Sequence, residues 1–283
     1  MEDRIRLKDK RKIVVKIGTS SLTQPDGRIN FDRIEKLSMV MSKMRATGKN
    51  LMLVSSGAIA VGASKIGASQ KPEKLSEKQA LASIGQAELI KIYDQAFGNY
   101  NQITAQILLT KDGVMNPIRR HNAKNTLNTL MSMNIIPIIN ENDTISTDEI
   151  EFGDNDTLSA HVAALADADL LIILSDIDGL YDGDPRKDEN ARIISKVVDI
   201  ESVEEFAGTT NSEFAKGGMV TKIAAAKLCY KSGIDMVIAH GEDPEIIYDI
   251  IQGKDVGTLF VGRKEFDLRK SKIPVNHFRE KLG

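Results

Sequence analysis

The sequence predicts an α/β protein in which a mostly parallel, open sheet is sandwiched between helices. Three observations lead to this prediction. Short apolar runs rich in β-branched residues alternate along the chain with longer segments of helical periodicity. The runs are continuously apolar, as expected of strands that are covered on both faces of a parallel sheet. No long linker, repeat or low-complexity tract interrupts the alternation.

Seven apolar runs are predicted to be strands. The first, K-I-V-V-K-I, delivers Lys16 to a turn of small residues at Gly18–Ser21. The second ends in a similar turn at Ser55–Ala58. In chain order the predicted strands are Lys12–Ile17, Asn50–Val54, Ile103–Leu108, Ile135–Ile139, Asp169–Leu174, Asp235–Ala239 and Thr258–Val261.

Segments with the apolar spacing of helices lie between these strands. Phe31–Ala46 places its apolar residues on one face and is followed by Gly48, a typical stop. Ser76–Phe97 is predicted to be a long helical region that Gly85 could interrupt. The other predicted helices are Pro117–Met133, Thr157–Ala166, Ser202–Phe206, a helix that opens at Gly217 and runs through Tyr230, and Pro244–Gln252.

The composition is that of a soluble globular protein. Of the 283 residues 41% are hydrophobic and 28% are charged, and the formal net charge is −2. Neither this charge nor the 5% of aromatic residues favours nucleic-acid binding. The longest apolar run, Leu170–Leu174, is far too short to span a membrane. The single cysteine, Cys229, excludes an intrachain disulfide framework and fits a reducing cytoplasm.

We expect one α/β domain, or two lobes on one continuous sheet, over residues 12–262. The first eleven residues are charged and are expected to form a solvated tail. Residues 263–283 are charged and weakly patterned, and are expected to form a C-terminal tail.

Two dense polar clusters flank the middle of the chain. Asn140, Asn142 and Asp143 directly follow a predicted strand, and a second cluster, Asp154 to Asp156, opens a predicted helix. Turns and helix caps favour Asn and Asp, which is the plainer interpretation. Ligands of open α/β sheets bind beyond the carboxyl ends of the strands, so we predict a site for a small polar ligand here.

Phosphate binding is predicted from small turns and lysines. The turns at Gly18–Ser21 and Ser55–Ala58, and Gly217-Gly218 at a helix start, expose backbone N–H groups to anions. Lys16 and Lys222 suit the stabilisation of a transferring phosphoryl group, with Asp156 placed to orient both. The Walker-like spacing at 62–69 is discarded, because it has Ala where the phosphate-binding Lys belongs. These residues predict a nucleotide-dependent transferase acting on a small polar substrate.

Six motifs in order resemble the amino acid kinase family, over roughly Lys12 to Phe260. They are V-K-I-G-T-S at Val15–Ser20, V-S-S-G-A-I-A at Val54–Ala60, P-I-I-N-E-N-D at Pro137–Asp143, G-D-N-D-x-L-S-A at Gly153–Ala160, G-L-Y-x-x-D-P at Gly179–Pro185 and G-G-M-x-T-K at Gly217–Lys222. The combination of N-E-N-D and G-D-N-D resembles those members that act on L-glutamate.

The resemblance implies the amino acid kinase fold and transfer of the ATP γ-phosphate to the γ-carboxylate of L-glutamate, the first step of proline biosynthesis. Mg²⁺ would be held mainly through the nucleotide phosphates, with no metal ligand among the site residues. An N-lobe would bind glutamate and a C-lobe ATP. The implied catalytic residues are Lys16, Lys222 and Asp156; the implied substrate-binding residues are Ser56, Gly57, Asn140, Asp143 and Asn155; and the implied ATP-binding residues are Lys16, Gly18, Ser175, Asp176, Lys216, Gly217, Gly218, Met219, Thr221 and Lys222.

The resemblance also implies a cytoplasmic homodimer or homotetramer with L-proline as feedback inhibitor, coupled functionally to glutamate-5-semialdehyde dehydrogenase, and with neither nucleic acid nor membrane as partner. The chain departs from the family pattern in three ways. It has Ala215-Lys216-Gly217-Gly218-Met219 where many members read G-T-G-G-M, it ends before the C-terminal PUA domain that many members carry, and its sequence after Phe260 does not closely match the common family ending. Two alternatives stay open at this point. One is a kinase for aspartate or N-acetylglutamate, and the other is a catalytically silent ligand-binding regulator.

Overall fold

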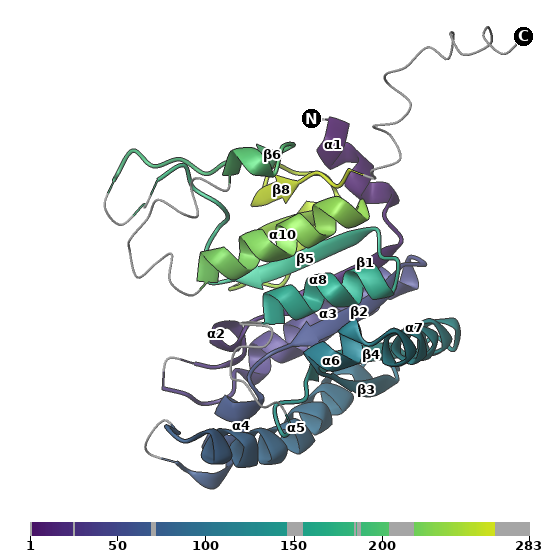
Figure 1. Cartoon of the computed structure of the whole chain (residues 1–283), viewed down its shortest axis with the longest axis vertical. Helices are drawn as coiled ribbons and strands as arrows, with labels where there is room; N and C mark the ends of the chain where they lie inside the picture. Colours follow the sequence, from purple (N-terminus) through teal and green to yellow (C-terminus); the bar gives the residue numbers. More distant parts are fainter. Residues whose placement is uncertain are drawn as a thin grey trace, which may run out of the picture.

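The computed structural model describes residues 2–24, 26–68, 72–145, 155–183, 185, 188–203 and 218–263. Helices cover both faces of one sheet in this part of the chain (Figure 1). None of the described helices combines the length and the apolar composition needed to cross a bilayer.

The described sheet has eight strands in the order β3-β4-β2-β1-β5-β7-β8-β6. Neighbouring strands are parallel except β7 and β8, which pair antiparallel. The strands are β1 (Lys12–Ile17), β2 (Asn50–Ser55), β3 (Thr104–Leu109), β4 (Ile136–Glu141), β5 (Leu170–Ser175), β6 (Lys196–Val197), β7 (Asp235–His240) and β8 (Thr258–Phe260).

Side chains of the central strand β1 alternate between two cores, because successive residues of a strand point to opposite faces. Ile13, Val15 and Ile17 pack in the core on one face of the sheet. Val14 packs in the core on the other face, and Lys16 shares that face by alternation. The strand pattern therefore directs Lys16 toward one particular layer of helices.

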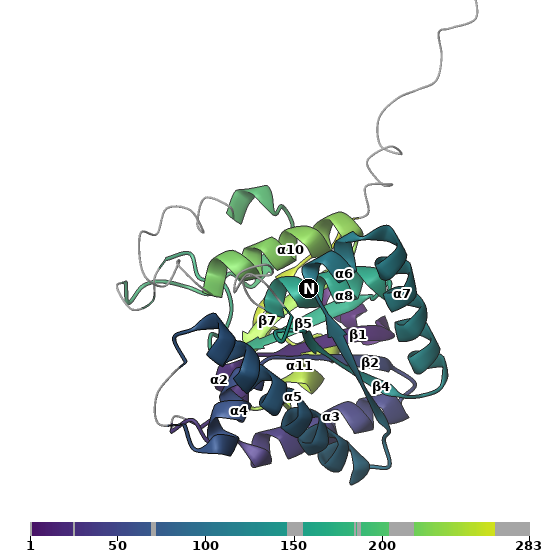
Figure 2. The same ribbon diagram turned by 60° about the horizontal axis from the view of Figure 1, so that its bottom comes forward.

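The two helical layers are visible on opposite sides of the sheet in Figure 2. The core on the first face receives side chains from α3 (Phe31–Ala46), α5 (Leu75–Gly98) and α11 (Ile246–Ile251). The core on the second face receives side chains from α7 (Pro117–Ser132), α8 (Asn155–Leu165) and α10 (Val220–Ser232). The remaining short helices are α1 (Glu2–Ile5), η1 (Arg6–Asp9), α2 (Thr19–Leu22), α4 (Ala58–Ile66), α6 (Lys111–Met115) and η2 (Glu201–Val203).

The predicted α/β class and the parallel sheet are confirmed, and each of the seven predicted strands is present with small shifts at its ends. The expected break near Gly85 is wrong, because α5 is one continuous helix. A Cβ atom at Gly85 would lie 1.7 Å from the carbonyl oxygen of Ala58, and one at Gly62 would lie 2.0 Å from that of Leu81. These glycines therefore permit a close crossing of α4 and α5.

The predicted solvated tail is also wrong for the described residues 2–11, which include α1 and η1 and bury Arg4 and Leu7. The Arg4 guanidinium is buried and donates to the backbone carbonyls of Ser195, Val256, Gly257 and Lys254 at 2.7–3.2 Å. Because these acceptors lie 191 to 253 positions away from Arg4 along the chain, the sequence pattern gave no sign of the contact. The predicted C-terminal tail lies outside the described residues from position 264 onward.

Candidate active site

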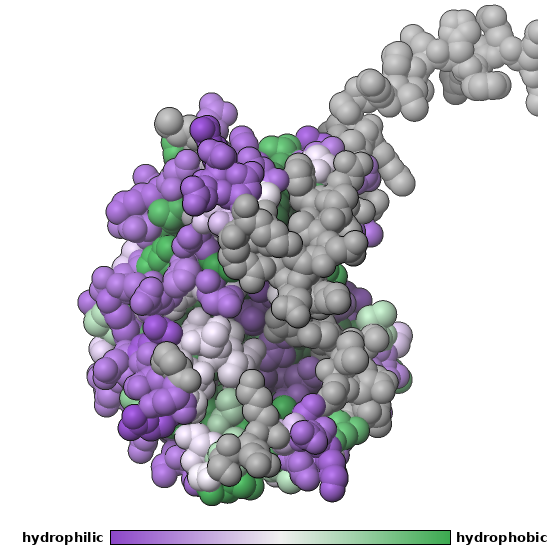
Figure 3. Space-filling view, turned by 90° about the vertical axis from the view of Figure 1, so that its left-hand side faces the viewer, coloured by the Kyte–Doolittle hydropathy of each residue, from purple (hydrophilic) through white to green (hydrophobic). Residues whose placement is uncertain are grey.

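The carboxyl ends of the parallel strands meet at one edge of the sheet, the edge that Figure 3 faces. Among the residues that Figure 3 colours by hydropathy, hydrophilic ones predominate on this face. Helices α8 and α10 begin close to this edge. Asp156, in the first turn of α8, contacts Lys16 near the end of β1 and Lys222 in the first turn of α10. Two polar clusters lie here.

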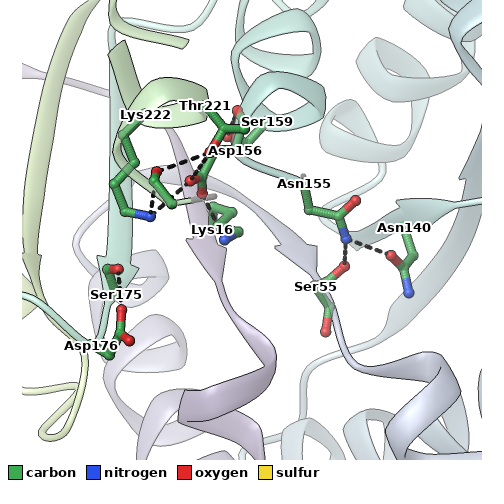
Figure 4. A network of polar contacts seen from close by, with 11 residues as sticks. Lys16, Ser55, Asn140, Asn155, Asp156, Ser159, Ser175, Asp176, Thr221 and Lys222 are labelled. Carbon is green, nitrogen blue, oxygen red and sulfur yellow. Dashed lines mark hydrogen bonds and ion pairs between the residues drawn. The ribbon is translucent and has the colours of Figure 1, made fainter. Parts of the chain in front are cut away.

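The first cluster joins Lys16, Asp156 and Lys222 (Figure 4). Lys16 Nζ lies 2.6 Å from Asp156 Oδ1, and Lys222 Nζ lies 3.0 Å from Asp156 Oδ2. The three residues are 3%, 0% and 5% exposed. Thr221 Oγ1 also donates to Asp156 Oδ2, at 3.3 Å. The prediction that Asp156 lies between the two lysines matches this geometry.

The charges of this cluster do not cancel. Two ammonium groups and one carboxylate leave a formal charge of +1. Burial disfavours the ionised form of Asp156, but the two lysines outweigh burial and hold the pKa of that carboxyl below its usual value. Asp156 also lies in the first turn of α8, where the helix dipole stabilises a negative charge. Two ammonium groups held together at a strand end favour binding of an anion such as a phosphate group.

Two glycines lie beside the lysine ammonium groups. A Cβ atom at Gly18 would lie 3.5 Å from Lys16 Nζ, and one at Gly218 would lie 3.7 Å from Lys222 Nζ. Gly218 also accepts a hydrogen bond from Lys222 Nζ through its carbonyl oxygen, at 3.2 Å. Side chains at these two positions would contact the cations that a phosphate has to reach.

The second cluster joins Asn155, Asn140 and the end of β2 (Figure 4). Asn155 Nδ2 donates to the carbonyl oxygen of Ser55 at 2.6 Å and to Asn140 Oδ1 at 2.8 Å. The backbone N–H of Glu141 also donates to Asn140 Oδ1, at 2.9 Å. Asn140 is 4% exposed and Asn155 is 8% exposed.

This network fixes the orientation of both amides. A backbone carbonyl carries no proton, so the Asn155 atom beside Ser55 O has to be the nitrogen. Both protons of that nitrogen are then used, and Asn155 has only its oxygen left for a ligand. Asn140 Oδ1 accepts twice, while its buried Nδ2 has no partner among the described residues. The pair therefore offers a ligand one acceptor and one donor group.

Three other predicted residues follow strand ends: Asp143 lies two residues after β4, and Ser56 and Gly57 directly follow β2. Burial raises the pKa of Asp143 to about 6, and no described residue forms an ion pair with it. The backbone N–H of Ser56 donates to the carbonyl oxygen of Ile17 at 3.2 Å. Gly57 has a φ of +91°, which favours glycine at the turn into α4. Asp143 is thus a half-buried acid without a cation, which suits a ligand that carries one.

Ser175 and Asp176 lie at the end of the neighbouring strand β5. Ser175 Oγ donates to Asp176 Oδ1 at 3.0 Å, and Asp176 is exposed. Met219 is buried at the start of α10. The predicted residues Lys216 and Gly217 lie outside the described residues.

Sequence reasoning missed three residues of this region. Ser159 Oγ donates to the carbonyl oxygen of Asp156 at 2.6 Å, and Ser55 supplies the acceptor for Asn155. The hydroxyl oxygen of Tyr93 lies 2.9 Å from Ser55 Oγ. Tyr93 occupies an apolar face of a long helix, and no local signal distinguishes it from other core residues.

A separate groove of about 790 Å³ opens on the α3 side of the β7 carboxyl end. Arg33, Lys36, Asp178 and His240 are among the residues that line it. None of the predicted site residues lines this groove. Its presence does not change the assignment of the two polar clusters.

Comparisons with known proteins show the family of the chain. The model of the amino acid kinase family matches residues 11–240. The chain is 52% identical to a glutamate 5-kinase of Clostridium perfringens over 263 residues, which cover 91% of this chain and 98% of that protein. It is 48% identical to a glutamate 5-kinase of Listeria innocua over 264 residues, covering 92% and 96%.

Solved structures of other kinases share the fold. Carbamate kinase from Giardia lamblia, bound to AMP-PNP, is 16% identical with a TM-score of 0.64, covering 90% of this chain and 100% of that one. UMP kinase from Ureaplasma parvum is 17% identical with a TM-score of 0.60, covering 89% and 99%. At these identities the likeness shows the fold alone.

Proposed function

Because the chain belongs to the amino acid kinase family, we propose that it transfers the γ-phosphoryl group of ATP to the γ-carboxylate of L-glutamate. The products are γ-glutamyl phosphate and ADP, and the reaction is the first step of proline biosynthesis. The single observation that carries this proposal is the buried cluster of Lys16, Asp156 and Lys222, in which one carboxylate holds two ammonium groups close together. The similarity to glutamate 5-kinases over nine-tenths of the chain supports the choice of substrate.

The chemistry needs positioned cations more than it needs an acid or a base. A carboxylate oxygen of glutamate attacks the γ-phosphorus, the bond to the β,γ-bridging oxygen breaks, and ADP leaves with the electron pair. The glutamate carboxylate is already ionised near pH 7, so no proton has to be removed. Lys16 and Lys222 stabilise the negative charge on the transferring group. Asp156 holds the two ammonium groups at fixed positions.

Recognition of the amino acid follows from the free atoms of the second cluster. The Asn155 oxygen and the Asp143 carboxylate accept from the substrate ammonium. The unpartnered Asn140 Nδ2 donates to a substrate carboxylate. Ser56 and Gly57 line the same turn after β2. We therefore assign glutamate to the side of the sheet edge formed by β2 and β4, and ATP to the side formed by β5 and α10.

Magnesium belongs to the proposal through the nucleotide. Among the residues that the structure describes, no three His, Cys, Asp or Glu side chains form a group that could hold a metal ion. Both oxygens of Asp156, the one carboxylate of the first cluster, contact lysines. We propose that the phosphates supply most ligands of Mg²⁺, which neutralises charge on them when bound.

Other parts of the proposal concern the protein in its cell. We propose a cytoplasmic homo-oligomer, inhibited by L-proline and coupled functionally to glutamate-5-semialdehyde dehydrogenase. The similarity of the sequence to glutamate 5-kinases supports these statements.

Trapping of the acyl phosphate tests the function directly. Purified protein is incubated with Mg-ATP and hydroxylamine, and with L-glutamate, L-aspartate or N-acetyl-L-glutamate, each with and without L-proline. We expect hydroxamate with L-glutamate, and less of it when proline is present. Hydroxamate with only one of the other acids would show that this acid is the substrate. If no hydroxamate forms although the protein binds ATP, the protein would instead be a catalytically silent regulator.

A further inference from the structure

We propose that Tyr93 is a positioning residue of the amino-acid site, acting through Ser55 on Asn155. This inference rests on the proposed function and adds to it a residue that lies outside the site. Tyr93 is fully buried on α5, and its hydroxyl oxygen lies 2.9 Å from Ser55 Oγ. Ser55 is the last residue of β2, and its carbonyl oxygen accepts a hydrogen bond from Asn155 Nδ2.

The direction of the hydrogen bonds follows from proton counting. Ser55 Oγ donates its single proton to the carbonyl oxygen of Ser56 at 3.0 Å. The proton between Tyr93 and Ser55 therefore comes from Tyr93. Burial raises the pKa of the Tyr93 hydroxyl far above its usual value, so the phenol stays a neutral donor.

This chain of donors fixes both peptide groups at the end of β2. Tyr93 holds Ser55 Oγ, and Ser55 Oγ holds the Ser56 carbonyl, so the backbone cannot rotate freely at the turn. The Ser55 carbonyl then has one direction, and it orients the Asn155 nitrogen. As a consequence the Asn155 oxygen is the atom that faces the ligand. Without Tyr93 the same amide would be held less firmly.

Packing holds Tyr93 itself in place. Its ring lies beside that of Phe97, with centroids 6.4 Å apart. The close crossing of α4 and α5 at Gly62 and Gly85 ties α5 to the helix that begins directly after Gly57. A helix on one face of the sheet thus supports the orientation of an amide at its edge.

Replacement of Tyr93 by Phe removes one hydroxyl group and leaves the ring. We expect the KM for L-glutamate to rise roughly threefold to tenfold, with kcat and the KM for ATP unchanged. Tyr100→Phe is the matched control, because it also removes one hydrogen bond, to Glu35, and lies between α5 and the first residue of β3, at the sheet edge opposite the site. A purely structural loss would affect both substrates, or the amount of active enzyme.

The inhibition constant of glutarate tests whether Asn155 is the residue affected. Glutarate keeps both carboxylates of glutamate. It lacks the ammonium group that would donate a hydrogen bond to the Asn155 oxygen. Its competitive inhibition constant should change less than twofold in Tyr93→Phe. A rise parallel to the KM for glutamate would overturn the route through Asn155.

Ser55→Ala breaks the same hydrogen bond from the other side, and it keeps the inference testable if Tyr93→Phe does not fold. Ser55→Ala should also raise the KM for glutamate, and adding Tyr93→Phe to it should cause little further change. Independent, multiplicative effects of the two substitutions would refute the coupling. Wild-type protein without activity on glutamate would refute the proposed function, whereas active wild type and an unchanged Tyr93→Phe would refute only this inference.

Discussion

Lys16 and Asp156 form a 2.6 Å ion pair between the end of β1 and the first turn of α8, and both side chains are enclosed. Lys222 binds the other carboxylate oxygen from α10. One carboxylate thus sets the separation of two cations that come from distant parts of the sequence. This relationship places two ammonium groups on the two oxygens of a single carboxylate.

Loss of either lysine should lower kcat strongly while the fold persists. Lys222→Ala and Lys16→Ala are each expected to reduce kcat by about 10²–10³, as removal of a group that stabilises transition-state charge does. Steady-state kinetics with Mg-ATP and L-glutamate measures the effect. Lys231→Ala, in the last turn of α10 and exposed, is the control and should retain wild-type turnover. Unchanged kcat in a site variant would remove that lysine from the mechanism.

Asp156→Asn should destabilise the protein because it leaves two buried ammonium groups facing each other. Removal of one partner from a buried ion pair costs about 3–5 kcal/mol of unfolding free energy. Denaturant unfolding measures this loss, and tripolyphosphate should restore part of it by replacing the missing anion. Asp167→Asn is the matched control, since it breaks an exposed ion pair with Lys124 and should cost no more than about 1 kcal/mol.

The same variant should change the acid limb of stability. The folded pKa of Asp156 lies below the ordinary 3.8. Its contribution is therefore complete above that value and is lost as the pH falls through the folded pKa. Asp156→Asn should be less sensitive to acid in this range. Equal acid sensitivity of the variant and the wild type would contradict the assigned ion pairs.

Local patterns predicted the sheet and the first cluster because both depend on strand ends. Lys16 ends a strand and Asp156 opens a helix at the same sheet edge, so their encounter followed from topology. Helix α4 was not predicted, since its sequence A-I-A-V-G-A-S-K-I consists mainly of small residues and begins after a glycine without a side-chain cap. The Arg4 contacts join residues 191 to 253 positions apart, which no local pattern can reveal.

The roles of the site residues stay predictions, although the structure brings most of them together. Tyr93 shows why sequence reasoning was incomplete here. Its hydroxyl group reaches Ser55 across 38 positions, and only the packing of α5 on the sheet makes that contact.

Asp143 should give the glutamate site a pH dependence. Burial raises its pKa to about 6, so the carboxylate becomes protonated as the pH falls through 6. A protonated Asp143 cannot pair with the substrate ammonium, and kcat/KM for glutamate should fall below this pH. The KM for ATP measured over the same range is the internal control and should not follow this limb.

Asp143→Asn tests this assignment. The variant should show a higher KM for glutamate at pH 8 and should lose the limb near pH 6. The contribution of wild-type Asp143 to folding stability should also depend on pH in the direction opposite to that of a paired acid such as Asp156. A raised pKa stabilises the folded state at low pH, and this contribution is lost as the pH rises from 3.8 through about 6. A limb that persists in Asp143→Asn would belong to another group.

Gly85→Ala should be far more harmful than an alanine elsewhere on the same helix. The new Cβ would lie 1.7 Å from the Ala58 carbonyl oxygen and 2.8 Å from the Gly62 nitrogen, which are backbone atoms that cannot rotate away. We expect the helices to separate, with a loss of about 3 kcal/mol or more in unfolding free energy. Gly98→Ala is the control, because a Cβ there meets nothing within 4 Å and should leave stability the same or slightly higher. α5 carries Tyr93 and α4 follows Gly57. Any folded Gly85→Ala protein should therefore also bind glutamate more weakly than the wild type does at the same ATP concentration. Equal stability of the two alanine variants would show that the helix crossing tolerates a side chain.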